Sequence, residues 1–180
     1  MSTVLSIERA LQIDGWMSQA ELEWLADHAS RADVVIEVGS YKGRSTRALG
    51  DSCRGKVYAV DPWGRYLKDD GTMYHLNPDL ETFKRNVQDL IDAGRVVPVR
   101  GLVKDVLDLL EPADLVFLDG DHRYENVLRE LGMFGKLLKP KGVLSGHDYG
   151  HPSWPGVKQA VDEVFGPEGT KHCGQIWWFE

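Results

Sequence analysis

The sequence predicts an α/β fold in which a mostly parallel sheet is covered by helices on both faces. Short apolar segments rich in β-branched residues alternate with segments of helical period along most of the chain. Glycine and acidic residues directly follow several of the apolar segments, where parallel sheets carry their ligand-binding loops. This pattern is typical of the doubly wound, Rossmann-like arrangement. The 180 residues suit one core, so we expect residues 1–180 to form a single domain.

The first third of the chain is expected to contain a helical cap and two strands. Residues 1–30 form the cap, in which Ser18 and Glu21 have the spacing of a capping box. "DVVIEVG" (33–39) predicts a buried strand, and "GRSTRALGD" (43–51) predicts the helix that follows it. "KVYAVD" (56–61) predicts the second strand, which ends at an acid.

Residues 62–78 have no clear period and are expected to form a lid loop over the ligand. Aromatic and other apolar groups gather there, and they either line an acceptor pocket or are scattered on an ordinary surface loop. These residues are Trp63, Tyr66, Met73, Tyr74 and His75.

The rest of the chain continues the alternation of helices and strands. Helices are expected over 78–94, 104–112, 123–140 and 156–166, and strands over 95–101, 113–119 and 141–148. "TKHCGQIWWFE" (170–180) is expected to add a short antiparallel strand or hairpin. Its "IWWF" belongs to the core or, if exposed, to a homodimer contact.

Composition and charge exclude several classes of protein. With 21 basic and 28 acidic residues the net charge is −7, which argues against nucleic acid as the main partner. We find no apolar run long enough to cross a membrane and no signal peptide. Two cysteines without CxxC spacing favour a reducing cytoplasm over a disulfide framework.

A first group of residues indicates a nucleotide-like ligand. Glu37 and Gly39 end the first strand, and Gly43 opens the next helix, where free backbone N–H groups can meet a ligand. The G-x-G-x-x-G pattern of dinucleotide sites is broken by Tyr41, and no P-loop is present. Asp61 stands where an acid that binds ribose hydroxyls is expected. An adenosine-bearing ligand without a diphosphate fits this pattern, although a simple glycine turn with a helix N-terminus would also produce it.

A second group places acids and histidines after two neighbouring strands. "DGDH" (119–122) and "GHDY" (146–149) would bring Asp119, Asp121, His122, His147 and Asp148 together. Carboxylates crowded in one place repel each other unless a positive charge lies among them, and a divalent cation would supply it. Mg²⁺ is favoured, with Mn²⁺ or another ion left open by the histidines. Taken singly, Asp121 could be only a helix cap, and each histidine could be an ordinary structural residue.

Five segments together resemble a known family: "GWMSQAELEWL", "VIEVGSYKGRST", "VYAVDPW", "DLVFLDGDHRYENVLREL" and "LLKPKGVLSGHDY". The chain resembles class I S-adenosylmethionine-dependent methyltransferases from about Gly15 to about Phe165. Within them it is most similar to the small bacterial O-methyltransferase-like group related to macrolide-sugar O-methyltransferases and cephalosporin hydroxylase-type proteins. The resemblance implies methylation of a hydroxyl on a small acceptor, such as a sugar or secondary metabolite.

The resemblance also implies a role for each matching position. The methionine part of S-adenosylmethionine would be wrapped by Glu37, Gly39, Ser40, Gly43 and Ser45. The ribose would be held by Asp61 and flanked by Pro62 and Trp63, and the adenine would lie along Gly101, Leu102 and Val103. Asp119 would contact the cofactor and act in catalysis, and it would bind the metal with His147 and Asp148. His122 would be the general base. Relatives carry Asp-Asn, Asp-Asp or Glu-Asp where this chain has His147-Asp148.

Two other functions remain open from the sequence. One is a cofactor-binding or degenerate member without catalysis, which the replacement of the usual acid by His147 allows. The other is a metal-dependent hydrolase, against which the cofactor-like loop at residues 39–45 argues.

Overall fold

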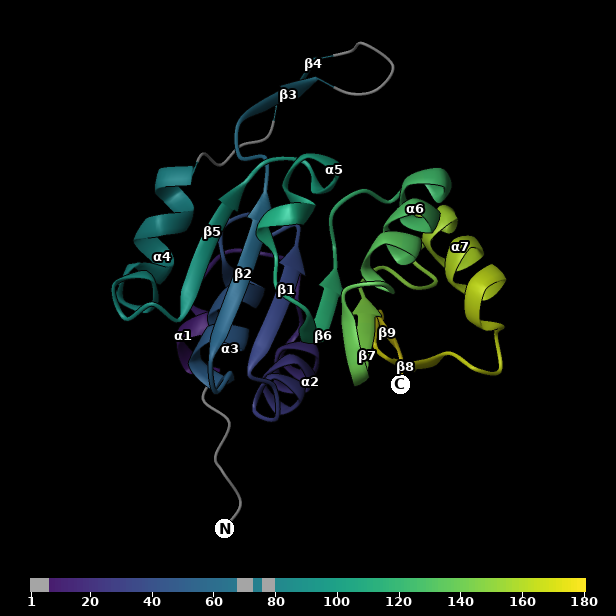
Figure 1. Ribbon diagram of the computed structural model, residues 1–180, viewed down its shortest axis with the longest axis horizontal. Helices are drawn as coiled ribbons and strands as arrows, with labels where there is room; N and C mark the ends of the chain where they lie inside the picture. Colours follow the sequence, from purple (N-terminus) through teal and green to yellow (C-terminus); the bar gives the residue numbers. More distant parts are fainter. Residues whose placement is uncertain (1–6, 68–72, 76–79) are drawn as a thin grey trace.

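The computed structural model describes residues 7–67, 73–75 and 80–180 of the chain (Figure 1). The described strands of the main sheet are β1 (Val34–Val38), β2 (Lys56–Asp61), β5 (Val96–Arg100), β6 (Ala113–Leu118), β7 (Leu138–Gly146), β8 (Lys171–Cys173) and β9 (Ile176–Phe179). They lie in the order β5-β2-β1-β6-β7-β9-β8. The first five pair in parallel, and β9 pairs antiparallel with β7 and β8. The predicted doubly wound, Rossmann-like fold class is therefore confirmed.

Helices cover both faces of this sheet. The described helices are α1 (Glu8–Leu11), α2 (Gln19–Ala29), α3 (Arg44–Ser52), α4 (Leu80–Asp92), α5 (Val103–Val106), α6 (Tyr124–Phe134) and α7 (Pro155–Phe165), with a 3₁₀ turn η1 (Leu107–Leu109) after α5. Side chains of β1 show why both faces are apolar. Val35 packs in the core under α1 to α4, whereas Val34 and Ile36 pack in the core under α5 to α7. Every residue of β1 is buried, as expected for a central parallel strand.

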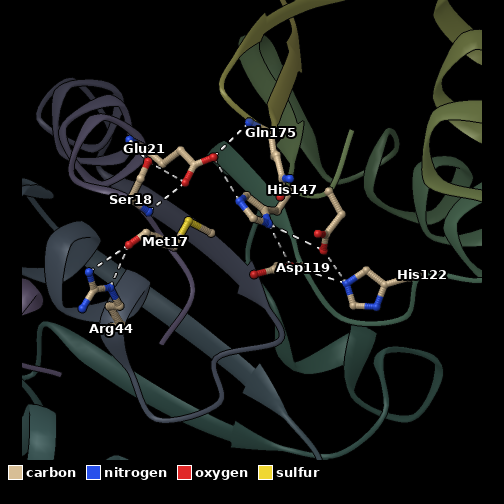
Figure 2. Close-up of polar contacts among 9 residues, drawn as sticks. Met17, Ser18, Glu21, Arg44, Asp119, His122, His147 and Gln175 are labelled. Atoms are coloured by element: carbon tan, nitrogen blue, oxygen red, sulfur yellow. Dashed lines mark hydrogen bonds and ion pairs between the residues drawn. The ribbon is translucent and has the colours of Figure 1, made fainter. Parts of the chain in front are cut away.

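The N-terminal segment is fastened to the sheet by specific polar contacts. Ser18 caps α2 with the predicted capping box, in which its side chain accepts the Glu21 N–H and its own N–H donates to the Glu21 carboxylate. The guanidinium of Arg44 donates to the carbonyl oxygens of Met17 and Ile13. Helix α3 therefore holds the chain segment that precedes α2 (Figure 2).

A buried arginine joins two helices behind the ligand-binding loops. Arg47 of α3 is 1% exposed and forms paired hydrogen bonds with Asp51 and with Asp89 of α4. Arg9 of α1 lies 2.8 Å from Asp89 and extends the network. These contacts fix the position of α3, whose N-terminus faces the carboxyl ends of the strands.

Two segments differ in detail from the sequence expectation, whereas the C-terminal segment agrees with it. Within residues 62–78, β3 (Arg65–Leu67) and β4 (Met73–His75) form an antiparallel pair, where only a loop was expected. The side chains of Tyr66, Met73, Tyr74 and His75 lie outside the described part of the structure. The helix expected over 123–140 ends at Phe134, because Gly135 caps it and the chain turns into β7. The C-terminal segment forms the hairpin β8–β9 and buries Ile176 and Trp177.

Candidate functional site

A cavity of about 810 Å³ lies at the carboxyl ends of the parallel strands. Loops after β1, β2, β5, β6 and β7 form its wall, together with the segment before α2 and parts of α6. Twelve of the sequence-predicted site residues line it: Gly39, Ser40, Ser45, Asp61, Pro62, Gly101, Leu102, Val103, Asp119, His122, His147 and Asp148. The other three, Glu37, Gly43 and Trp63, lie behind that wall and support it.

Two glycines shape the loop after β1. Gly39 has φ +88°, and Gly43, at the N-cap of α3, has φ +89°, both in the left-handed region that favours glycine. A Cβ atom on Gly43 would lie 3.2 Å from side-chain atoms of Phe83 and Val87. The loop therefore packs closely on α4 and leaves backbone N–H groups of the α3 N-terminus toward the cavity.

Glu37 supports this loop from below. Its side chain is fully buried and accepts hydrogen bonds from the hydroxyls of Ser40 (2.7 Å) and Thr46. Burial raises the pKa of Glu37 to about 7, and the surrounding hydroxyl groups only partly offset that rise. The sequence expected Glu37 to contact a ligand, whereas here its visible role is to join β1 to α3.

Asp61 connects the loops after β1 and β2. Its carboxylate accepts the backbone N–H of Tyr41 at 2.9 Å and that of Trp63 at 2.8 Å. Burial raises the pKa of Asp61, and these N–H groups oppose the rise. Trp63 is buried against Phe83, and its indole N–H donates to the carbonyl oxygen of Tyr41. Each carboxylate oxygen has a second lone pair, so Asp61 can still accept hydrogen bonds from hydroxyl groups of a ligand in the cavity.

On the other side of the cavity, two carboxylates and two imidazoles meet where β6 and β7 end. His122 Nε2 lies 2.7 Å from Asp148 Oδ2 and 3.7 Å from Asp119 Oδ1. His147 Nδ1 lies 3.6 Å from Asp148 Oδ2 and 3.8 Å from Asp119 Oδ1. Parallel pairing of β6 with β7 brings these residues together, as the sequence predicted.

The charges in this cluster compensate each other. Burial lowers the pKa of His122, but its contacts with Asp119 and Asp148 outweigh this and raise it to about 9. Burial likewise lowers the pKa of His147, and its contacts with Asp148 and Glu21 raise it to about 10. Burial raises the pKa of Asp148, but the two imidazoles hold it well below its usual range. Both histidines are therefore protonated at neutral pH in the metal-free protein.

The donor set fits a divalent cation. One ligand atom each from Asp119, His122 and Asp148 lie within 4.8 Å of one another, so small side-chain movements would bring them onto one ion. Two carboxylates with an imidazole suit Mg²⁺ or Mn²⁺. This group of possible metal ligands contains His122, to which the sequence analysis assigned only the role of general base. Asp121 is separate, because its carboxylate pairs with Arg123 and accepts hydrogen bonds from the backbone N–H of Arg123 and the side chain of Asn126.

The sequence suggested that His151 and Trp154 border the acceptor pocket, and both line the cavity, where Trp154 stacks on His122 with ring centroids 4.6 Å apart. Other residues near the cavity carried no functional signal in the sequence, among them Trp16, which packs on Tyr41 at the cavity wall. Glu21 was predicted only as a helix cap, yet it also contacts His147. Glu21 and His147 are 126 positions apart in the chain, so no local sequence pattern could predict their contact.

Comparison with known proteins shows a family match. Residues 36–149 match the family model described as a methyltransferase domain. A curated relative, the uncharacterized protein R132 of Acanthamoeba polyphaga mimivirus, is 24% identical over 152 residues. That alignment covers 79% of this chain but only 64% of the relative, so the chain spans less than two thirds of that protein.

Solved structures share the fold. Cofactor-bound Rv0187 from MTB superposes with a TM-score of 0.69 at 20% identity, covering 96% of this chain and 84% of the other. The O-methyltransferase from Bacillus cereus in complex with SAH gives 0.68 at 18% identity, covering 96% and 89%. At these identities the similarity supports the fold alone. Within the described ranges, none of the helices has the length and apolar character needed to cross a bilayer.

Proposed function

The chain belongs to the methyltransferase-domain family that its residues 36–149 match, and from this premise we propose that it transfers a methyl group from S-adenosylmethionine to a hydroxyl oxygen of a small acceptor. One observation carries the proposal. A single cavity joins the glycine loop and Asp61 on one side to the cluster of Asp119, His122 and Asp148 on the other. A methyl donor and its acceptor can therefore meet inside one cavity.

The cofactor half of the cavity suits an adenosine-bearing molecule. Backbone N–H groups at the α3 N-terminus offer donors for the carboxylate of a methionine group, and Ser40 and Ser45 line the same end of the cavity. Asp61 offers acceptors for ribose hydroxyls. Gly101, Leu102 and Val103 give a mainly apolar wall for a planar base. Family relatives crystallised with SAH or another cofactor support this assignment.

The proposed reaction needs a proton acceptor but no acid for the leaving group. S-adenosylmethionine supplies a methyl on a sulfonium: the S–CH₃ bond breaks, an O–CH₃ bond forms, and S-adenosylhomocysteine and the hydroxyl proton are released. His122 faces the cavity and is the proposed acceptor of that proton at Nε2. Because its pKa is about 9 in the metal-free protein, we expect methyl transfer to be fastest at alkaline pH.

A divalent cation would add to this chemistry by lowering the pKa of the acceptor hydroxyl. The residues that would hold it are Asp119, Asp148 and an imidazole, with Mg²⁺ favoured over Mn²⁺. These carboxylates would also fix the direction from which the acceptor oxygen approaches. The acceptor is proposed to be a small hydroxylated molecule, because the cavity is enclosed by tryptophans and histidines and the chain carries a net charge of −7.

The decisive experiment is calorimetric titration of S-adenosylhomocysteine into metal-stripped protein. We expect micromolar affinity, about −8 kcal/mol. Asp61→Ala should weaken binding by about 10-fold or more, since removal of the carboxylate takes away the ribose acceptors and releases two backbone N–H groups. Absence of binding by a folded sample would refute the methyltransferase assignment and would favour a metal-dependent hydrolase.

A further inference from the structure

We propose that Glu21, in helix α2, is a positioning residue that fixes the imidazole of His147 at the reacting end of the cavity. Figure 2 shows the carboxylate reaching from α2 toward the histidine at the end of β7. Glu21 Oε1 and His147 Nε2 are 3.3 Å apart, and both side chains are buried. The contact links the N-terminal segment to the carboxyl end of the sheet.

The ring orientation follows from which nitrogen meets which partner. An imidazole has two distinct nitrogens, and the hydrogen bond at one determines what the other can do. Nε2 of His147 faces Glu21, so Nδ1 faces the carboxylates of Asp119 and Asp148. In both the neutral and the protonated form of the ring, Nε2 carries a hydrogen that it donates to Glu21. Nδ1 is then the nitrogen presented to the reacting groups.

Glu21 is itself held rigidly. Its Oε2 accepts both the backbone N–H (2.8 Å) and the hydroxyl (2.7 Å) of Ser18. Its Oε1 accepts the backbone N–H of Gln175 at 2.9 Å, besides facing His147. Burial raises the pKa of Glu21, but these hydrogen bonds outweigh it and lower the value to about 2. The carboxylate is therefore ionised at neutral pH and can only accept.

The turn between β8 and β9 is shaped to admit this carboxylate. Gly174 has φ +59°, and a Cβ atom there would lie 2.7 Å from Glu21 Oε1. Any larger residue would push the carboxylate away from both Gln175 and His147. Segments from α2, the end of β7 and the β8–β9 turn therefore converge on one contact. Such convergence goes beyond what a helix cap requires, since the capping box uses only Oε2 of Glu21, while Oε1 meets Gln175 and His147.

The consequence for catalysis rests on the proposed function. A carboxylate behind an imidazole sets which ring nitrogen carries hydrogen, and such pairs commonly orient histidines that bind metals or move protons. In this chain His147 would thereby offer Nδ1 to the same carboxylates that contact His122. We expect Glu21→Gln to lower kcat for methyl transfer by about 10- to 100-fold, with the S-adenosylhomocysteine affinity unchanged.

The test itself needs neither acceptor nor cofactor. Long-range ¹H–¹⁵N NMR spectra of the full-length, metal-free protein report which ring nitrogens of each histidine carry hydrogen, and His147→Asn assigns the signals. In wild type we expect His147 to show a protonated Nε2 whose hydrogen exchanges slowly with solvent. In Glu21→Gln this hydrogen should lose its protection and exchange rapidly with solvent. Glu23→Gln, a matched change on the exposed side of α2, should keep the protection.

Two results would overturn the proposal. A His147 whose only hydrogen is on Nδ1 in wild type would contradict it without reference to any variant. Equal loss of protection in Glu23→Gln would mean that the overall charge of α2, not the Glu21 contact, controls the ring. Failure of S-adenosylhomocysteine to bind would refute the proposed function but leave these spectra interpretable. The two hypotheses can therefore fail separately.

Discussion

Gly39 and Asp119 meet backbone to backbone where β1 and β6 end. A Cβ atom on Gly39 would lie 2.1 Å from the carbonyl oxygen of Asp119. The Asp119 N–H donates to the carbonyl oxygen of Val38 at 2.8 Å, and the Gly39 N–H donates to that of Val60 at 2.9 Å. The loop proposed to face the cofactor and the strand that ends at Asp119 are thus in direct contact, and a change in one displaces the other.

We therefore expect Gly39→Ala to impair stability and ligand binding together. The backbone at φ +88° disfavours a side chain by ~1–3 kcal/mol, and the contact with Asp119 adds to that cost. Urea denaturation and calorimetry with S-adenosylhomocysteine measure the two effects. Gly132→Ala is the matched control, because it lies in α6 with open space around its Cβ position and should be stabilising by up to ~1 kcal/mol. Wild-type affinity in Gly39→Ala would contradict the role of this contact.

The second prediction concerns Arg47 behind the cofactor loop. Arg47→Met leaves the carboxylates of Asp51 and Asp89 without their buried partner and should lower the free energy of unfolding by about 2–3 kcal/mol. The cost stays below that of a fully buried pair because Asp89 is half exposed. Arg31→Met removes an exposed ion pair with Asp27 and should cost under ~1 kcal/mol. Equal effects in urea denaturation would show that Arg47 does not join α3 to α4.

Local patterns were sufficient for the strands and for the residues at their ends. β1 and β2 are short apolar segments that stop at Gly39 and Asp61, and both residues line the cavity as predicted. Parallel pairing then brings Asp119 next to Asp148, because neighbouring parallel strands end at the same edge. The capping box of Ser18 with Glu21 was visible for the same reason, since its partners are three positions apart.

Contacts between distant segments could not be obtained in this way. Nothing in the local sequence of α2 indicates that Glu21 also meets His147, since that contact depends on how the cap packs against the β8–β9 turn. The resemblance assigned Glu37 and Trp63 to the cofactor, and these roles stay predictions; both side chains are buried in the structure. Which imidazole joins the carboxylates depends on side-chain rotamers, and a sequence does not specify these.

The third prediction is a dependence of stability on pH. The pKa of His122 is raised from 6.5 to about 9 in the folded protein, so folding is favoured by its protonation. That contribution is fully present below pH 6.5 and is lost as pH rises from 6.5 to about 9. In EDTA-treated protein, urea denaturation should show a fall of ~3 kcal/mol over this interval from His122 alone, to which His147 adds, and His122→Gln should abolish the His122 part. His172→Gln, an exposed histidine, should retain the full slope. A wild-type slope in His122→Gln would mean that His122 is not coupled to the carboxylates.

The last prediction tests the metal. Calorimetric titration of Mn²⁺ into EDTA-treated, dialysed protein should show one site, and Asp148→Asn should weaken it by about 10-fold or more, since a carboxylate ligand is lost. Binding should release protons, because His122 and His147 are protonated in the metal-free state, and the heat should therefore depend on the ionisation enthalpy of the buffer.

Asp121→Asn is the control for this measurement, because the carboxylate lies in the same loop but is paired with Arg123 outside the cluster. It should leave the Mn²⁺ affinity within about twofold. Equal weakening in both variants would indicate a general effect of negative charge rather than coordination. If wild-type protein binds S-adenosylhomocysteine but not Mn²⁺, the imidazolium groups of His122 and His147 would be sufficient to neutralise Asp119 and Asp148. Deprotonation of the acceptor would then depend on His122 alone, and methyl transfer should be insensitive to EDTA.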